Sequence, residues 1–215
     1  MKLSDHVACA IEDRRAGKFE SALMHACVAV DGTAKRLYPN ESGNRERCVR
    51  SYYWLIEPML HAGLNLTECR FENVPLKHTS SPDFADIVYA IFRCSLAHGD
   101  EVPDGFSVLE AEDESPTRWR MGYGELHMPK SIVPALLAVT VFSKINRDQT
   151  STGGHFLSLD QDRFIIAGWW GREDDFRPIA ASKNTIRVTL KNTGGAAKYE
   201  GGPRRDYVVL LTDEP

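Results

Sequence analysis

Apolar residues recur at intervals of three and four positions through the first half of the chain, which is the spacing of an amphipathic α-helix. Glycine and proline residues interrupt this spacing and mark where each helix should stop. We therefore expect four helices, over about residues 3–17, 19–38, 45–63 and 84–98, with a kink at Pro58 in the third. Each has one apolar face to bury, so the four are expected to pack as a bundle.

The fourth of these helices has the clearest start and stop signals. Ser80 or Ser81 is a suitable N-cap, and Pro82 fits the first turn, where its missing N–H is not needed. Gly99 follows the last periodic residue and is expected to end the helix. An α-helix at about 100° per residue is therefore predicted up to residue 98.

Strand-like patterns appear only beyond this helix. Two alternating runs, over 106–111 and 118–123, precede an apolar helix that Pro129 opens and that extends to about Ile145. Four short β-rich runs then cover 156–159, 163–166, 185–190 and 207–211. The expected fold is mainly α, with a helical domain over 1–150 that contains a short β insertion at about 104–126, and a β-rich extension over 151–215.

Composition fits a chain with a sizeable apolar core. Of the 215 residues, 42% are hydrophobic and 26% are charged, and the net charge of −4 disfavours a protein that binds nucleic acid over its whole surface. The longest apolar run, 132–142, is too short to cross a bilayer, and the N-terminus lacks the pattern of a signal peptide. We expect a cytoplasmic protein that is not bound to a membrane.

Motifs of the common cofactor and metal enzymes are missing from the sequence. There is no P-loop, no glycine-rich dinucleotide fingerprint, no H-E-x-x-H and no G-x-S-x-G. The five cysteines form no C-x-x-C pair, and their odd number fits poorly with a secreted disulfide framework. We expect reduced cysteines, no bound metal and no cofactor.

Arg93 and His98, near the end of the fourth helix, have the chemistry needed to cleave RNA without a metal. A guanidinium can hold a phosphate, and an imidazole can move a proton near neutral pH. The spacing alone is weak, because the 17 Arg and 7 His of the chain would give roughly 1.7 such pairs by chance and a second pair, Arg120 and His127, exists. The second pair lies in a glycine-containing stretch without a helical period, so its context disfavours it.

The segment from Ile91 to Glu101, I-F-R-C-S-L-A-H-G-D-E, resembles the signature of the HEPN superfamily. This superfamily is all-helical, and its nuclease members carry an arginine and a histidine, with four to six residues between them, at the end of a core helix. Residues 25–38 resemble a HEPN core helix more loosely. The resemblance implies a HEPN-like bundle of four to five helices. It also implies that His98 acts as general acid or base at the ribose 2′-hydroxyl while Arg93 stabilises the phosphate.

The same resemblance implies a metal-independent endoribonuclease of the toxin or antiviral-defence type. Its substrate would be RNA, because internal attack requires the 2′-hydroxyl, and its product would carry a 2′,3′-cyclic phosphate. Family nucleases usually place the motif at a two-fold interface, so a homodimer is the expected active form. A toxin of this type would also have an antitoxin or another protein as its partner.

The residues leave three alternatives open. Cys94 follows the motif arginine where family nucleases often have asparagine, which is compatible with a non-catalytic HEPN-like module that binds a protein or a nucleotide. Arg93 could instead pair with a nearby carboxylate such as Asp100, while His98 caps the helix. An unrelated α+β protein would place Arg93 and His98 in separate environments.

Three further residues are predicted to support the site. Arg47 and Arg50 are i, i+3 neighbours on a helix and are predicted to contact RNA phosphates; the alternative is a solvated surface paired with carboxylates such as Glu46. Asp31, in the second helix, is predicted to be a second-layer partner of Arg93 and His98. The alternative for Asp31 is an exposed charge or a local cap.

Overall fold

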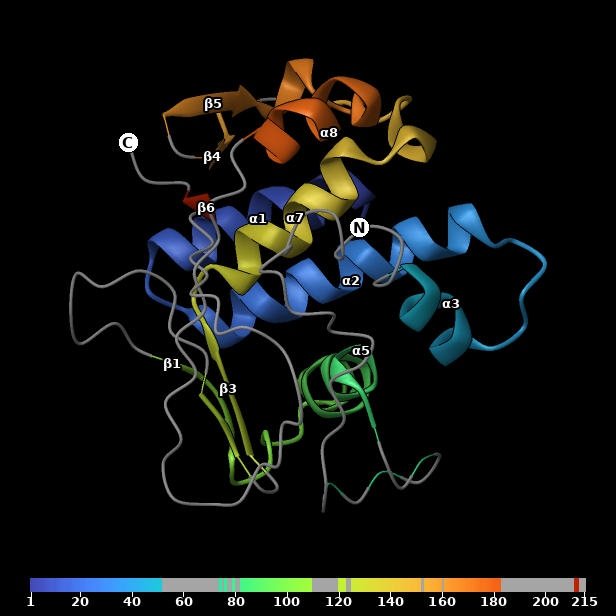
Figure 1. Ribbon diagram of the computed structural model, residues 1–215, viewed down its shortest axis with the longest axis vertical. Coiled ribbons are helices and arrows are strands. Elements are labelled where there is room, and N and C mark those ends of the chain that lie inside the picture. Colours follow the sequence, from blue (N-terminus) through green and yellow to red (C-terminus); the bar gives the residue numbers. More distant parts are fainter. Residues whose placement is uncertain are drawn as a thin grey trace.

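The computed structural model describes residues 1–51, 74, 76, 79, 82–109, 120–122, 125–151, 153–159, 161–182 and 211–212. Helices dominate this part of the chain, and two small sheets lie at opposite ends of it (Figure 1). The prediction of a mainly helical fold with a few strands is confirmed. The finer prediction, a HEPN-like bundle, stays a prediction.

The first two helices form a hairpin with nearly the bounds expected from the sequence. They are α1 (Leu3–Arg15) and α2 (Phe19–Leu37). Between them Gly17 has a φ of +75°, a left-handed conformation that glycine adopts without strain. The buried face of the hairpin packs against α7 (Ile132–Phe142), which lies across it (Figure 1).

α7 is the centre of the core, since all 11 of its residues are buried. It begins three residues later than predicted, because Pro129 ends strand β3 (Glu125–Pro129) and does not open the helix. Proline is tolerated at the end of a strand, where it removes no needed donor. Although α7 is apolar throughout, none of the described helices is long and apolar enough to cross a membrane.

The predicted fourth helix runs continuously from Phe84 to His98, but it is not a regular α-helix. A π-helical segment, η2 (Val88–Arg93), separates α5 (Phe84–Ile87) from α6 (Cys94–His98). The expectation of one uninterrupted α-helix was therefore wrong at its centre. The wider turns of a π-helix change which residues share a face, and such segments occur frequently at functional sites.

The start of this helix is capped by a pair of carboxylates. The backbone N–H of Asp86 donates to Asp83 Oδ1 at 2.9 Å, and the backbone N–H of Asp83 donates to Asp86 Oδ2 at 3.3 Å. This reciprocal arrangement is a capping box. The predicted N-cap, Ser80 or Ser81, was wrong, because Asp83 satisfies the free N–H groups of the first turn.

The described part of the third helix is α3 (Asn44–Ser51). Its start confirms the expected position, whereas the predicted kink at Pro58 and stop at Gly63 lie outside the described residues. Arg45 of α3 pairs with Asp86, which connects α3 to the first turn of α5.

Two three-stranded sheets complete the described fold. In the first, β3 lies between β1 (Phe106–Leu109), to which it is parallel, and β2 (Arg120–Gly122), to which it is antiparallel. The predicted β insertion at about 104–126 is therefore a sheet, and it continues to residue 129. The second sheet is antiparallel, in the order β5 (Asp162–Ile165), β4 (Phe156–Leu159), β6 (Leu211–Thr212).

The strands of the second sheet agree in part with the predicted runs. They are β4 (Phe156–Leu159), β5 (Asp162–Ile165) and β6 (Leu211–Thr212). The predicted run over 185–190 lies outside the described residues, as does 207–210.

The segment predicted to be β-rich, 151–215, also contains a helix. α8 (Glu173–Ser182) forms despite Pro178 in its interior, a residue that weakens the helical signal in the sequence. Its Phe176 is buried and stacks on Phe142 of α7, with ring centroids 3.8 Å apart. Phe164 of β5 meets the same Phe142 ring edge-on at 5.5 Å. The segment after residue 151 thus shares an aromatic core with the helical part.

Candidate functional site

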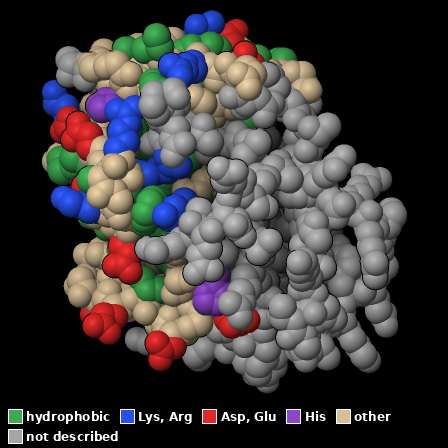
Figure 2. Space-filling model, turned by 90° about the vertical axis from the view of Figure 1, so that its left-hand side faces the viewer, with side chains coloured by type: hydrophobic (Ala, Val, Ile, Leu, Met, Phe, Trp, Pro, Cys, Tyr) green, Lys and Arg blue, Asp and Glu red, His purple; other side chains and the backbone are tan. Residues whose placement is uncertain are grey.

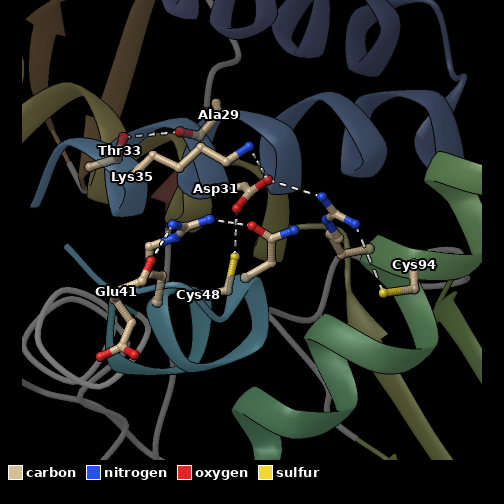
Figure 3. Close-up of polar contacts among 10 residues, drawn as sticks. Ala29, Asp31, Thr33, Lys35, Glu41, Cys48 and Cys94 are labelled. Carbon is tan, nitrogen blue, oxygen red and sulfur yellow. Dashed lines mark hydrogen bonds and ion pairs between the residues drawn. The ribbon is translucent and has the colours of Figure 1, made fainter. Parts of the chain in front are cut away.

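Asp31 of α2 is a buried carboxylate, with a side chain that is 4% exposed. Its Oδ2 lies 3.0 Å from Arg93 Nη2 and 3.3 Å from Lys35 Nζ, and its Oδ1 accepts a hydrogen bond from Cys48 Sγ at 3.2 Å. Figure 3 shows these side chains converging on Asp31 from α2, α3 and the helix that carries Cys94. Asp31, predicted as a second-layer partner of Arg93 and His98, is therefore in direct contact with Arg93.

The Asp31–Arg93 pair stays ionised at neutral pH. Burial alone would raise the pKa of Asp31, but the hydrogen bonds from Cys48 and Arg93 and the charges of Lys35 and Arg93 outweigh it and hold the pKa below its ordinary value. Burial alone would lower the pKa of Arg93, but the hydrogen bond and charge of Asp31 raise it. Each partner thus stabilises the charged form of the other.

The rest of the Arg93 guanidinium has weaker partners. Nη1 lies 4.0 Å from Cys94 Sγ, the ring of Tyr89 is centred 5.5 Å from Cζ, and the buried Nε has no hydrogen-bond partner. Burial, followed by the charge of Cys94, raises the pKa of Tyr89 to about 12, so its hydroxyl is neutral. Arg93 is 17% exposed, and its Nη1 has no carboxylate partner among the described residues.

Cys48 is a hydrogen-bond donor and not a reactive thiol. Burial raises the pKa of this thiol, and the neighbouring negative charge of Asp31 raises it further. A neutral, fully buried thiol is a poor nucleophile and a poor metal ligand. Among the residues that the structure describes, no group of three His, Cys, Asp or Glu side chains is arranged to hold a metal ion.

His98 lies at the exposed end of the same helix. Gly99 ends the helix with a φ of +75°, as predicted, and the Asp100 N–H donates to the Ser95 carbonyl at 2.9 Å. The His98 side chain makes no hydrogen bond or ion pair with the described residues. Arg93 ends the π-helical segment and His98 ends α6, and at the α-helical 100° per residue the five steps between them amount to about 140° around the axis. The structure brings Asp31 to Arg93 and leaves His98 in solvent.

The predicted RNA contacts, Arg47 and Arg50, already have partners within the chain. Arg47 donates to the Glu41 carbonyl and to the Asn44 side chain. Arg50 pairs with the Glu41 carboxylate at 3.2 Å and lies over the Tyr38 ring. This arrangement is close to the alternative expected from the sequence, a helix surface paired with carboxylates, except that the carboxylate is Glu41 and not Glu46. A role for these two arginines in RNA binding stays a prediction.

Three contributors to the site were not predicted from the sequence. Lys35 is four residues from Asp31 on α2, and Tyr89 is four residues before Arg93, so helical spacing offered a signal for both. Cys48 offered none, because only the packing of α3 against α2 brings its thiol to Asp31.

Comparison with known proteins places the chain among relatives without an assigned activity. The model of a protein family named Rv1289 matches residues 2–194. Two similar proteins are "Uncharacterized protein Rv1289" of Mycobacterium tuberculosis strain H37Rv and "Uncharacterized protein Mb1320" of Mycobacterium bovis. Each is 31% identical over 195 residues, which cover 88% of this chain and 91% of the relative. No solved structure matches the chain.

Proposed function

The chain belongs to the Rv1289 family, and we propose that it is a metal-independent endoribonuclease of the toxin or antiviral-defence type, built on a HEPN-like bundle. The observation that carries this proposal is the buried Asp31–Arg93 ion pair. It holds a guanidinium on a helix whose exposed end carries His98, an imidazole without a partner among the described residues. A cytoplasmic location and RNA as the substrate belong to the same proposal.

In the proposed reaction the chain supplies two groups and the RNA supplies the nucleophile. His98 takes the proton of a ribose 2′-hydroxyl, and the 2′-oxygen attacks the adjacent phosphorus. The bond from phosphorus to the 5′-oxygen breaks, the leaving oxygen takes up a proton from water, and a 2′,3′-cyclic phosphate remains. Arg93 stabilises the charge that builds up on the phosphoryl oxygens. A positioned histidine typically contributes about 10²–10⁴-fold to such a reaction.

Asp31 acts in this proposal as a positioning residue for Arg93. Its Oδ2 holds Nη2 at 3.0 Å and so fixes the guanidinium, and in the proposed reaction Nη1 exchanges its weak contact with Cys94 Sγ for a phosphate oxygen. Lys35 adds a second positive charge 3.3 Å from the same carboxylate oxygen. With the Cys48 thiol neutral, the cluster of Asp31, Arg93 and Lys35 has a net charge of +1, which favours an anionic substrate.

A homodimer would complete this site. Arg93 and His98 point about 140° apart around one helix, which does not suit both groups acting on one phosphate within a single copy. A two-fold contact through the exposed end of α6 would place His98 of each copy near Arg93 of the other. An antitoxin or another protein bound to this helix end would then block the site.

The second candidate is a non-catalytic HEPN-like module that binds a protein or a nucleotide. The observation in its favour is that Arg93 is only 17% exposed and already has a carboxylate partner, as expected for an ion pair that only joins α2 to η2. The absence of asparagine after Arg93, where the chain has Cys94, favours the same candidate.

RNA cleavage by the His98→Ala variant distinguishes the two candidates. We expect the purified wild-type protein to cleave end-labelled single-stranded RNA and leave 2′,3′-cyclic phosphate ends, and the variant to be slower by about 100-fold or more. Asp100→Asn, an exposed change two residues away, serves as the matched control and should keep wild-type cleavage. Wild-type protein without cleavage, or equal cleavage by His98→Ala, would contradict the catalytic proposal.

A further inference from the structure

Four positively charged side chains near the α1–α2 turn and the β4–β5 hairpin have no carboxylate partner among the residues that the structure describes. They are Arg15, Lys18, Lys130 and Arg163, and we call them the basic surface. Most of the other described arginines and lysines are paired with carboxylates, for example Arg36 with Asp148 and Lys144 with Asp174. Unpaired cations keep their full charge available for an external anion.

Two aromatic rings are interleaved with these cations. The guanidinium carbons of Arg15 and Arg163 lie 5.8 and 4.8 Å from the centroid of the Phe156 ring. Lys130 Nζ lies 3.8 Å from the centroid of the Phe19 ring, and Phe19 directly follows Lys18. Phe156 thus joins Arg15 of α1 to Arg163 of β5, and Phe19 joins Lys130 to the start of α2. The two groups meet at the α1–α2 turn, where Arg15 and Lys18 are three residues apart in the sequence.

The figures place these elements on one side of the molecule. The α1–α2 turn and the β4–β5 hairpin lie on the same side in Figure 1. Figure 2 views that side, and Lys and Arg side chains gather on its described part. The arginines Arg15 and Arg163 and the lysine Lys18 are exposed, whereas Lys130 is half-buried.

The nearby carboxylates of α1 are occupied by other groups. Glu12 lies 3.6 Å from His155 Nε2, and Asp13 accepts a hydrogen bond from Ser21 Oγ at 2.5 Å and lies 3.8 Å from His25 Nε2. Both carboxylates are therefore engaged by groups other than Arg15 and Arg163. The basic surface therefore differs from a typical helix surface, in which each cation is paired with a neighbouring acid.

We propose that the basic surface binds the sugar-phosphate backbone of single-stranded RNA. Ammonium and guanidinium groups neutralise phosphates, and guanidinium planes and aromatic rings stack on unpaired bases. The choice of RNA over other polyanions rests on the proposed ribonuclease function. Four clustered charges also explain how a chain with a net charge of −4 can bind an anionic polymer locally.

The basic surface is separate from the Arg93 cluster. Phe19 begins α2 and Asp31 lies 12 residues further along it, which at about 1.5 Å per residue is about 18 Å. RNA held on the basic surface would therefore be anchored away from the scissile phosphate. Loss of this anchor should weaken binding and leave the chemical step at saturating RNA unchanged.

RNA binding is measured with a protein that cannot cleave, so that binding and cleavage are tested separately. The His98→Ala chain is titrated into a short fluorescein-labelled single-stranded RNA, and anisotropy gives the Kd at several salt concentrations. When Arg15→Ala and Arg163→Ala are added, the magnitude of the negative slope of log association constant against log salt concentration should fall by about 1.4. Each phosphate contact on a single strand contributes about 0.7 to that magnitude. For two proteins of equal affinity at about 1 M salt, this change of slope corresponds to a loss of affinity of about 25-fold at 0.1 M salt.

Lys144→Ala with Arg172→Ala is the matched control. It removes the same charge from two exposed cations, each of which is paired with a carboxylate at 2.7 Å. The control should change the Kd by less than about threefold, as expected for exposed cations that are already paired. Equal affinities and equal salt slopes in the Arg15/Arg163 variant and the control would overturn the proposal. That result would not contradict the proposed ribonuclease function. Conversely, a wild-type protein that binds RNA with the expected salt dependence but does not cleave it would contradict the ribonuclease function and not the basic surface.

Discussion

Arg93 Nη2 lies 3.0 Å from Asp31 Oδ2, so a carboxylate near the end of α2 holds a guanidinium that is 62 residues away in the sequence. The same carboxylate accepts a hydrogen bond from Cys48 of α3. Asp31 therefore connects three helical segments through one buried side chain. Any change at this position should affect stability as well as the proposed chemistry, and the two effects must be measured separately.

Asp31→Ala should destabilise the protein by about 3 kcal/mol, because it leaves the charge of Arg93 mostly buried without its partner. The free energy of unfolding from urea titration at pH 7 measures the loss. Asp148→Ala is the matched control, since it removes an exposed carboxylate from the Arg36 pair, and it should cost less than about 1 kcal/mol. Equal costs at the two positions would contradict a structural role for the buried pair.

Acid should remove the contribution of Asp31 to stability. The pKa of this carboxyl is lower in the folded protein than in the unfolded chain, so at acid pH the unfolded chain binds more protons. The stabilisation is therefore present above about pH 4 and is lost as the pH falls through the lowered pKa of the folded state. Urea midpoints between about pH 6 and pH 3 should fall more steeply for wild type than for Asp31→Asn. Parallel curves would show that Asp31 gains nothing from its partners.

Local patterns predicted the long helices well. α1 and α2 follow from apolar spacing and from the glycine and proline that bound them, which are properties of neighbouring residues. The π-helical segment from Val88 to Arg93 and the short helix α8 do not follow from such patterns. Both depend on how a segment packs against the core, as the stacking of Phe176 on Phe142 illustrates.

The candidate site was predictable only as a set of residue types. Arg93 and His98 stand out by their position at a helix end, and Asp31 could be proposed as a partner because α2 was correctly located. The contact of the Cys48 thiol with Asp31 could not be predicted, because it depends on the approach of α3 to α2, which is a tertiary feature. The divergence of Arg93 and His98, in contrast, follows from their five-residue separation on one helix.

The imidazole of His6 should make stability fall below neutral pH. The Nδ1 atoms of His6 and His25 lie 3.0 Å apart, and burial, followed by the charge of His25, lowers the pKa of His6 from its ordinary value of 6.5. The unfolded chain thus takes up a proton that the folded protein resists, and stability decreases as the pH falls below about 6.5. His6→Gln should flatten the melting temperature between about pH 7.5 and pH 5.5.

His98→Gln is the control for this pH dependence, because its imidazole is exposed and has no partner among the described residues. It should leave the pH dependence of the melting temperature as in wild type. If His6→Gln and wild type lose the same number of degrees on acidification, the His6–His25 contact does not resist protonation.

Gly171→Ala should cost much more stability than Gly17→Ala, although both glycines have a φ of +75°. An alanine at either position costs about 1 kcal/mol for the left-handed backbone.

The space around the added Cβ differs between the two positions. At Gly17 no atom lies within 4 Å of it, whereas at Gly171 it would lie 2.4 Å from Arg147 Cβ and 2.5 Å from Arg147 Cα. Relief of that overlap requires a backbone shift, and overpacking of this kind costs roughly a further 1–3 kcal/mol. The Gly171 N–H also donates to the Val141 carbonyl of α7 at 2.8 Å, so the shift would disturb the centre of the core. Urea unfolding of the two variants measures the difference, and equal losses would show that the backbone around Arg147 yields freely.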